Sequence, residues 1–260
     1  MLDFVSIKYK KKNSQVIVYP EFKARRSKDL MIRGRSFYAI WDEDAGYWSR
    51  DEYDVQRLVD KMIYDFVQEH SFDSPVEMKL MIDFSTNSWT EWQKYCKSLA
   101  DNFNELDVNV TFSNTKIKKT DYISHSLPYG MIDQETPAYE ELISTLYDET
   151  ERRKIEWAIG AVIAGDSKYL QKFIVLYGAP GSGKSTLLNI IQAMFPGYYS
   201  IFDSKALTKV SNAFALEAFR TNPLIAIEHD GDLSRVEDNT KLNSIVSHEE
   251  MMVNEKFKSA

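Results

Sequence analysis

The sequence predicts a mixed α/β protein with a small α+β domain over residues 1–125, a helical region over 126–165 and an α/β core over 166–260. Three observations carry this prediction. Helical and strand patterns alternate through the first half of the chain. Two uninterrupted apolar runs, 173–177 and 223–227, are typical of strands buried on both faces of a parallel sheet. The first run leads directly into a helical pattern, as expected for a strand–helix unit.

The composition is that of a globular protein. Of its 260 residues, 43% are hydrophobic and 27% are charged, which excludes wholesale disorder. No apolar run reaches the ~20 residues that span a bilayer, and the first residues lack a signal-peptide pattern, so we expect a cytoplasmic protein without a membrane partner. Cys96 is the only cysteine, which excludes an internal disulfide and a Cys-rich metal site. The four histidines are scattered without metal-ligand spacing.

The charge is unevenly distributed along the chain. The net charge is −7, yet residues 1–36 hold ten Lys/Arg against three acids and therefore carry +7. One interpretation is an arm that faces nucleic acid. The other is the solvated side of a β-hairpin, since 7–10 and 16–19 have strand patterns around a polar turn at Asn13-Ser14. Both interpretations stay open at this point.

The rest of the N-terminal domain is predicted from its patterning. Apolar side chains recur at helical spacing over 52–69, and this stripe is expected to lie in the core. A second helix is expected to begin at Ser88 as its cap, and its aromatic residues have helical spacing, which favours packing over base stacking. The aromatic residues are Trp89, Trp92, Tyr95 and Phe103, and Leu99 shares their spacing. Further strands are expected at 37–41, 77–84 and 108–112, with a turn at 42–46.

The domain boundary is expected within 118–137, which is polar and basic and ends in a helix start. Thr136 is the expected cap and Pro137 the first helical residue. Two helices, 137–149 and 151–164, are predicted to follow, with Gly165 ending the second.

The strongest motif in the chain reads GAPGSGKST and lies between the apolar run 173–177 and a predicted helix over 186–195. This is the pattern G-x4-G-K-[ST] in strand–helix context, which is typical of a phosphate-binding P-loop. Its glycines allow the backbone to turn tightly around phosphates with several N–H groups pointing inward. The N-terminus of the following helix adds its dipole behind those donors.

The motif predicts ATP and Mg²⁺ as cofactors. Lys184 is expected to reach the β- and γ-phosphates, and Ser185 to offer a hydroxyl to Mg²⁺. The nucleotide-binding residues are predicted to be Gly178, Ala179, Pro180, Gly181, Ser182, Gly183, Lys184, Ser185 and Thr186.

A carboxylate partner for Mg²⁺ is expected about forty residues later. The apolar run 223–227 ends in Glu228, and acids at the carboxyl end of a parallel strand lie where ligands bind. Glu228 is therefore predicted to hold Mg²⁺ and order the attacking water. Asp230 is the competing candidate, because an offset of two residues keeps it on the same strand face. Asp232 is expected to be a helix cap or turn residue.

The end of the sequence is predicted to hold an amphipathic helix near 238–247, followed by a turn and a strand over 247–258. Lys256 and Lys258 would share one face of this strand and contact phosphates. The alternative is that both are solvated surface lysines.

Together these motifs resemble the superfamily 3 helicases, in particular the viral and phage branch that contains poxvirus and phage primase-helicases. GAPGSGKST matches the Walker A motif of that family, LIAIEHDGDL fits the Walker B position, and SHEEMMVNEKFKS resembles the B′ motif. The regions 41–60 and 127–165 look like the part that precedes the ATPase. Two departures are the turn Ser247-His248-Glu249, where the family usually has a GGD-like turn, and Glu-His-Asp in place of paired acids.

The resemblance implies an AAA+-like ATPase that assembles as a hexameric ring and moves on single-stranded or forked DNA. It implies DNA contacts by Lys256 and Lys258, and less securely by His248. An arginine from a neighbouring subunit would complete the ATP site. The expected function is therefore an ATP-dependent DNA helicase or translocase in the replication of a phage or mobile element, in the host cytoplasm beside other replication proteins. Priming activity is not expected, since no primase region fits in this chain.

The family's sensor strand and arginine finger are absent from the sequence, so we expect a truncated core and the N-terminal part of a longer protein. In that fold the missing strand lies between the two motif strands, and direct hydrogen bonds between these strands would refute this view of the sheet. Two other functions are considered. One is a fragment that binds nucleotide or DNA without hydrolysis. The other is a small-molecule P-loop kinase, which the lack of an Arg-rich lid after residue 186 disfavours.

Overall fold

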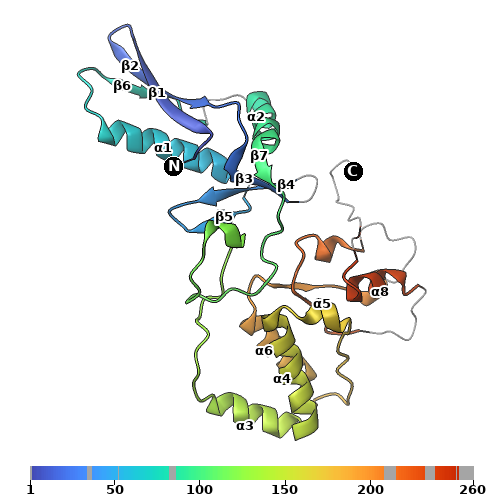
Figure 1. The fold of residues 1–260 in the computed structure, drawn as a ribbon. Helices are drawn as coiled ribbons and strands as arrows, with labels where there is room; N and C mark the ends of the chain where they lie inside the picture. The colour runs from blue at the N-terminus through green and yellow to red at the C-terminus, as the bar shows by residue number, and fades with distance from the viewer. Residues whose placement is uncertain are drawn as a thin grey trace. The chain divides into compact units, whose positions relative to one another are not determined.

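The computed structural model divides the chain into two compact units (Figure 1). The first comprises 1–107 and 116–125, and the second comprises 108–115 and 126–260. The structure describes residues 2–33, 37–51, 53–81, 86–207, 215–231, 238–249 and 251.

A hairpin and a short third strand build the first sheet of the N-terminal unit. β1 (Val5–Lys12) pairs antiparallel with β2 (Gln15–Phe22), and β2 pairs parallel with β6 (Val76–Met78). Asn13 and Ser14 both have positive φ, 48° and 60°, as in the two-residue turns that match the twist of hairpin strands. The predicted hairpin is confirmed.

β6 is shorter than the predicted strand 77–84. After Met78 the chain leaves the ladder, and the backbone N–H of Met81 donates instead to the Asp60 carboxylate at 2.7 Å. Residues 82–85 lie outside the described part of the chain.

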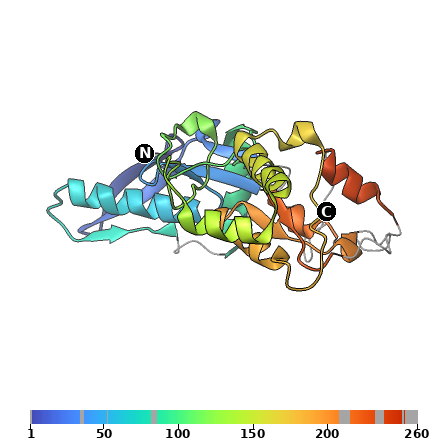
Figure 2. The ribbon, with the colours of Figure 1, turned by 90° about the horizontal axis from the view of Figure 1, so that it is seen from below.

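Helix α1 (Asp54–Glu69) covers one face of this sheet, as Figures 1 and 2 both show. Its buried side chains are Val55, Leu58, Val59 and Ile63, which confirms the predicted stripe. They share a core with Val16 and Val18 of β2. The opposite face of the sheet carries the polar side chains of β1.

The second sheet of this unit has the strand order β5-β4-β3-β7. Its strands are β3 (Ser27–Arg33), β4 (Phe37–Asp42), β5 (Tyr47–Ser49) and β7 (Ala100–Asn102). β4 and the turn after it confirm the prediction. β3 was not predicted, because Lys28, Asp29 and Arg33 surround its buried Leu30 and Met31 and hide the alternation.

Helix α2 (Thr86–Leu99) begins and ends earlier than the sequence indicated. Ser88 lies inside its first turn, so the prediction of Ser88 as the cap is wrong. Phe103 lies beyond the helix and is 65% exposed, because Ala100 already pairs with Ser27 of β3 in the second sheet. The packing role of the aromatic residues is confirmed for Trp92, whose ring lies 4.2 Å from that of Phe22.

The predicted strand 108–112 is wrong. The segment belongs to the second unit and has no strand assignment. Its backbone pairs irregularly with a neighbouring loop: Leu127 N–H donates to Thr111 O at 2.7 Å and Ser113 N–H to Tyr129 O at 3.1 Å. A short 3₁₀ turn, η2 (Lys119–Asp121), belongs to the first unit.

Two antiparallel helices open the second unit, α3 (Pro137–Leu146) and α4 (Glu149–Ala164). The predicted helices are confirmed with a boundary shifted to 147–148. Asp148 caps α4 by accepting a hydrogen bond from Glu151 N–H at 2.9 Å, and Gly165 ends it with a φ of 74°.

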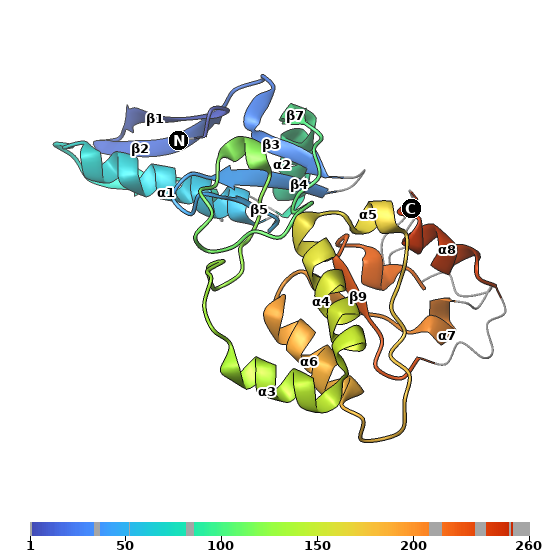
Figure 3. The same cartoon turned by 60° about the horizontal axis from the view of Figure 1, so that its bottom comes forward.

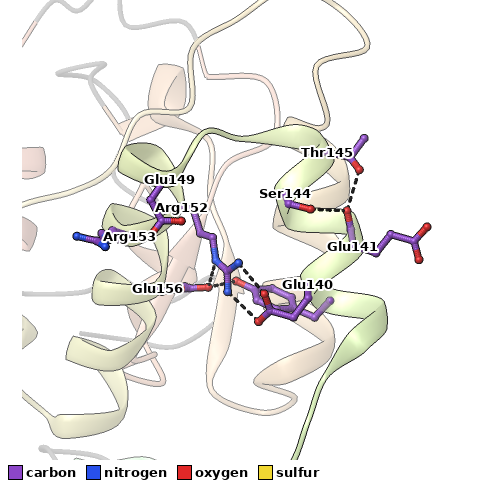
Figure 4. A network of polar contacts seen from close by, with 9 residues as sticks. Glu140, Glu141, Ser144, Thr145, Glu149, Arg152, Arg153 and Glu156 are labelled. Carbon is purple, nitrogen blue, oxygen red and sulfur yellow. Dashed lines mark hydrogen bonds and ion pairs between the residues drawn. The ribbon is translucent and has the colours of Figure 1, made fainter.

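Arg152 of α4 forms ion pairs with a glutamate on each of the two helices (Figure 4). Its guanidinium donates to both carboxylate oxygens of Glu140 on α3, at 2.6 and 2.8 Å. Its Nε donates to Glu156 one turn along α4 at 2.7 Å. This bidentate contact joins α4 to α3.

The rest of the second unit is built around helix α6 (Lys184–Met194) and a two-stranded parallel sheet. β8 (Tyr199–Ile201) pairs with β9 (Ile225–Ile227). Leu127, Phe195 and Tyr198 are buried in the core beside them. Helix α6 and the last helix agree with the predictions. β9 is a strand as predicted, but Ala226 is exposed, so the strand is not buried on both faces. β8 was not predicted. The shorter elements are α5 (Ser167–Leu170), α7 (Ser204–Leu207), η3 (Glu217–Phe219) and α8 (Thr240–Val246).

The apolar run 173–177 does not form the buried strand that the sequence predicts. Phe173, Val175 and Tyr177 are 53%, 62% and 99% exposed. Only Leu176 is partly buried, against a core cluster of α3, α4 and α6. The reason is that no strand in the described part of the chain pairs with this run, so it has no sheet to be buried in. β9 pairs with β8 and not with 173–177.

None of the helices in the described ranges is both long enough and apolar enough to span a membrane.

Candidate functional site

The loop 178–183 connects the exposed run 173–177 to helix α6. Gly181 and Gly183 have φ of 80° and 81°, a conformation that strains any residue with a Cβ atom. Ser182 N–H donates to Ala179 O at 3.3 Å and closes a tight turn inside the loop. Gly181 and Gly183 therefore allow the sharp backbone bend that the sequence predicts.

Gly183 is also held by packing. A Cβ atom on Gly183 would lie 2.6 Å from Leu146 Cδ2 at the end of α3. Directly below the loop, Leu187 of α6 is buried with Ile143 of α3 and Ile155 of α4. The α3–α4 hairpin thus packs against both Gly183 and the first turns of α6. Figure 3 shows both helices beside α6.

The Lys184 amine lies within the loop. Its Nζ donates to Gly178 O at 2.9 Å, to Ala179 O at 2.8 Å and to Ser182 Oγ at 3.2 Å. Lys184 is also the first residue of α6, so one positive charge and the positive end of the helix dipole occupy the same place.

The first turn of α6 presents several donors to the loop. The backbone N–H groups of residues 184–186 have no carbonyl four residues earlier within the helix, whereas Leu187 N–H already donates to Gly183 O at 3.0 Å. The side chains of Ser185 and Thr186 are exposed on this turn. A helix start with free N–H groups, a lysine and hydroxyls is suited to bind an anion such as a phosphate.

A second polar group lies at the carboxyl end of β9. Glu228 Oε1 accepts two hydrogen bonds, from the backbone N–H and from the hydroxyl of Ser204, both at 2.9 Å. Ser204 is 2% exposed and begins α7. The carboxylate is partly buried. Sequence reasoning missed Ser204 because the strand that leads to it, β8, was not recognised.

His229 connects the end of β9 to α6. Its Nε2 lies 2.7 Å from Gln192 Nε2, with the amide group as donor. Asp230 follows and is exposed. No hydrogen bond or ion pair among the described residues joins Glu228 or Asp230 to Lys184 or Ser185. The two polar groups belong to one unit, and the Gln192–His229 contact joins the end of β9 to the second half of α6 and not to the loop.

The oxygen atoms available here have the chemistry that Mg²⁺ requires. Ser185 offers a hydroxyl and Glu228 a carboxylate, and Mg²⁺ prefers such hard oxygen ligands and keeps several waters and substrate phosphates. In the described ranges, no cluster of three or more His, Cys, Asp or Glu side chains forms a metal site made by protein alone. Ser185 and Glu228 are the predicted magnesium ligands, and no contact among the described residues joins these two side chains.

The predicted DNA contacts are only partly covered by the structure. His248 is exposed directly after α8, with a φ of 56° and its N–H donating to Ile245 O at 3.1 Å. Lys256 and Lys258 lie outside the described residues, as does Asp232.

Comparison with known proteins adds one finding. Residues 176–260, about a third of the chain, match the model of a family of unknown function (DUF5906). The matched part begins just before the loop 178–183 and contains α6, β8, β9 and α8. A search of curated proteins found no significant match.

Proposed function

We propose that this protein is an ATP-dependent DNA helicase or translocase, and that its C-terminal unit is a P-loop ATPase core of the AAA+ type. The observation that carries the proposal is the Lys184 amine inside a glycine loop at the start of α6. The resemblance of the surrounding motifs to superfamily 3 helicases supports the choice of DNA as the substrate.

The loop and the start of α6 would bind the triphosphate of ATP. Phosphate oxygens would replace Gly178 O, Ala179 O and Ser182 Oγ as partners of Lys184, because an anion binds an ammonium group more strongly than a neutral carbonyl does. The N–H groups of the first turn of α6 would add donors in the same direction.

Ser185 and Glu228 would hold Mg²⁺, which neutralises the charge that develops on the phosphates. Glu228 would also orient the attacking water, with Asp230 as the competing residue for this role. Lys184 would stay on the β- and γ-phosphates throughout.

The partners in this proposal are those of a replicative motor. His248, Lys256 and Lys258 would contact single-stranded or forked DNA, and a hexameric ring would place an arginine from the neighbouring subunit at each ATP site. Host cytoplasm, with other replication proteins, would be the setting.

The experiment is ATP binding by fluorescence titration, together with steady-state hydrolysis with and without single-stranded DNA. Lys184→Ala is compared with Lys172→Ala, a matched control at an exposed lysine just before the loop. We expect DNA-stimulated turnover in the parent protein and in Lys172→Ala, and loss of ATP binding and turnover in Lys184→Ala. Equal ATP affinity in all three proteins would overturn the proposal.

A nucleotide-binding or DNA-binding fragment without turnover is the second candidate. It is favoured by the exposure of 173–177 and by the lack of a described contact between Glu228 and the loop. ATP binding that depends on Lys184, without hydrolysis at any DNA concentration, would support this second candidate.

A further inference from the structure

The outer face of the first sheet carries a row of lysines. Lys8, Lys10 and Lys12 alternate along β1, so their side chains share the face opposite to α1. The other face of β1 contains Val5, which is buried in the core. We define the lysine face by these three lysines and the residues paired with them. Those residues are Tyr19 beside Lys8, Ile17 beside Lys10 and Gln15 beside Lys12.

The charge on this face is only partly compensated, by Glu21 beside Lys8 and by Glu77, which pairs in register with Ile17. No ion pair among the described residues involves Lys10 or Lys12, and that of Lys8 with Glu21 is long, at 3.9 Å, and half-exposed. On the third strand, Glu77 is paired with Lys79 at 2.5 Å. The face is thus positive in a protein whose net charge is −7, which makes it complementary to a polyanion.

Protection of an exposed sheet edge accounts for part of the pattern, since lysines on an edge strand prevent strands of other molecules from pairing with it. Here the charges of residues 8–12 are all positive, and Lys11 extends them to the other face.

The lysine face also contains an aromatic ring. Tyr19 is partly exposed, and Lys10 Nζ lies 5.4 Å from its ring centroid. Sheet faces that combine aromatic rings with lysines bind single strands, because unpaired bases stack on the ring while the cations contact the phosphates. In a duplex the bases are paired and stacked on one another, so none would be available to stack on the Tyr19 ring.

We propose that the lysine face is a binding surface for single-stranded nucleic acid, with Tyr19 stacking on a base and Lys8, Lys10 and Lys12 on the sugar-phosphate backbone. It lies wholly in the N-terminal unit, and it requires neither ATP nor the loop 178–183.

The test is fluorescence anisotropy of the full chain with a fluorescein-labelled dT20 oligonucleotide over a range of salt concentrations. The variant Lys8→Glu/Lys10→Glu/Lys12→Glu is compared with Lys154→Glu/Lys168→Glu/Lys172→Glu. The control makes the same change in net charge at exposed lysines of the second unit. Far-UV circular dichroism confirms that both variants are folded.

We expect the lysine-face variant to bind at least ~10-fold more weakly than the control. The slope of log affinity against log salt should fall by about 2, since each phosphate contact to a single strand contributes about 0.7. Tyr19→Leu should weaken binding by roughly 5- to 100-fold with little change in that slope, because it removes stacking and leaves the charges.

Equal affinity of the two triple variants would overturn the proposal, as would a blunt duplex or polyglutamate that binds as tightly as dT20. Lys184→Ala separates this inference from the proposed ATPase. Binding of dT20 by Lys184→Ala at the affinity of the parent protein is expected, even if no variant hydrolyses ATP.

Discussion

Glu228 accepts two hydrogen bonds from Ser204 on a single carboxylate oxygen, both at 2.9 Å. The orientation of this carboxylate is therefore set by the start of α7 and not by the loop 178–183. A buried serine that fixes a partly buried carboxylate is a positioning residue, since its effect on any reaction would act through Glu228.

Under the proposed ATPase function, Ser204→Ala should lower kcat by about 3- to 10-fold with little change in KM, because one of two bonds that orient the carboxylate is lost. Ser204→Thr keeps the hydroxyl and should recover most of the rate. Steady-state kinetics of both variants measures this. A purely structural role would lower kcat in Ser204→Thr as much as in Ser204→Ala.

Gly183→Ala should destabilise the protein more than Gly181→Ala, although both glycines have nearly the same φ. A Cβ on Gly181 meets nothing within 4 Å, so only backbone strain of about 1–2 kcal/mol is expected. A Cβ on Gly183 would collide with Leu146, which adds about 1–3 kcal/mol. Urea denaturation of each variant measures the loss in the free energy of unfolding.

The double variant Gly183→Ala/Leu146→Ala is the control for this difference. Removal of the Leu146 side chain should abolish the collision, so the two substitutions should be less destabilising together than the sum of their separate effects. Strict additivity would contradict the contact between α3 and the loop.

The buried Asp42 carboxylate predicts a pH dependence. Burial raises its pKa, but the bond from Arg57 at 2.6 Å and backbone N–H donors in the turn outweigh burial, so the pKa lies below its usual 3.8. A lowered pKa contributes stability above about pH 4, and this stability is lost as the pH falls through the pKa of the folded state.

Asp42→Asn should therefore reduce the free energy of unfolding by about 1–3 kcal/mol at pH 7, and the difference should shrink as the pH falls through the lowered pKa of the folded state. Urea denaturation followed by tryptophan fluorescence is suited to this, since Trp41 and Trp48 lie in the same sheet. A difference that is constant with pH would mean that the charge of Asp42 is not what stabilises the turn.

Arg152→Met should loosen the α3–α4 hairpin while keeping the apolar part of the side chain. Glu140 is half-exposed, so we expect a small loss of thermal stability, which high salt should reduce. Thermal unfolding at low and high salt concentrations measures it. A loss that is unaffected by salt would point to packing and not to the ion pairs.

The sequence predicted the elements whose signal is local. The stripe of α1, the turn at Asn13 and the glycine loop before Lys184 all follow from spacing or from the conformational demands of single residues. The core position of Val55 and Ile63 needed no knowledge of what lies opposite them.

Prediction from the sequence failed for segments whose structure depends on contacts with residues far away in the chain. The run 173–177 has the composition of a buried strand, but burial needs neighbouring strands and the described residues supply none. β7 is a strand only because β3 lies beside it, and helix α2 ends for the same reason. The role of Ser204 follows only from its hydrogen bond to Glu228 in the structure.

The exposed run 173–177 has a consequence for the behaviour of this chain in solution. A short, uncharged segment rich in β-branched and aromatic residues is the type of sequence that stacks into cross-β assemblies. Lys172, directly before it, is the nearest charge in the sequence. Self-association that increases with protein concentration is therefore the behaviour expected from this exposed run.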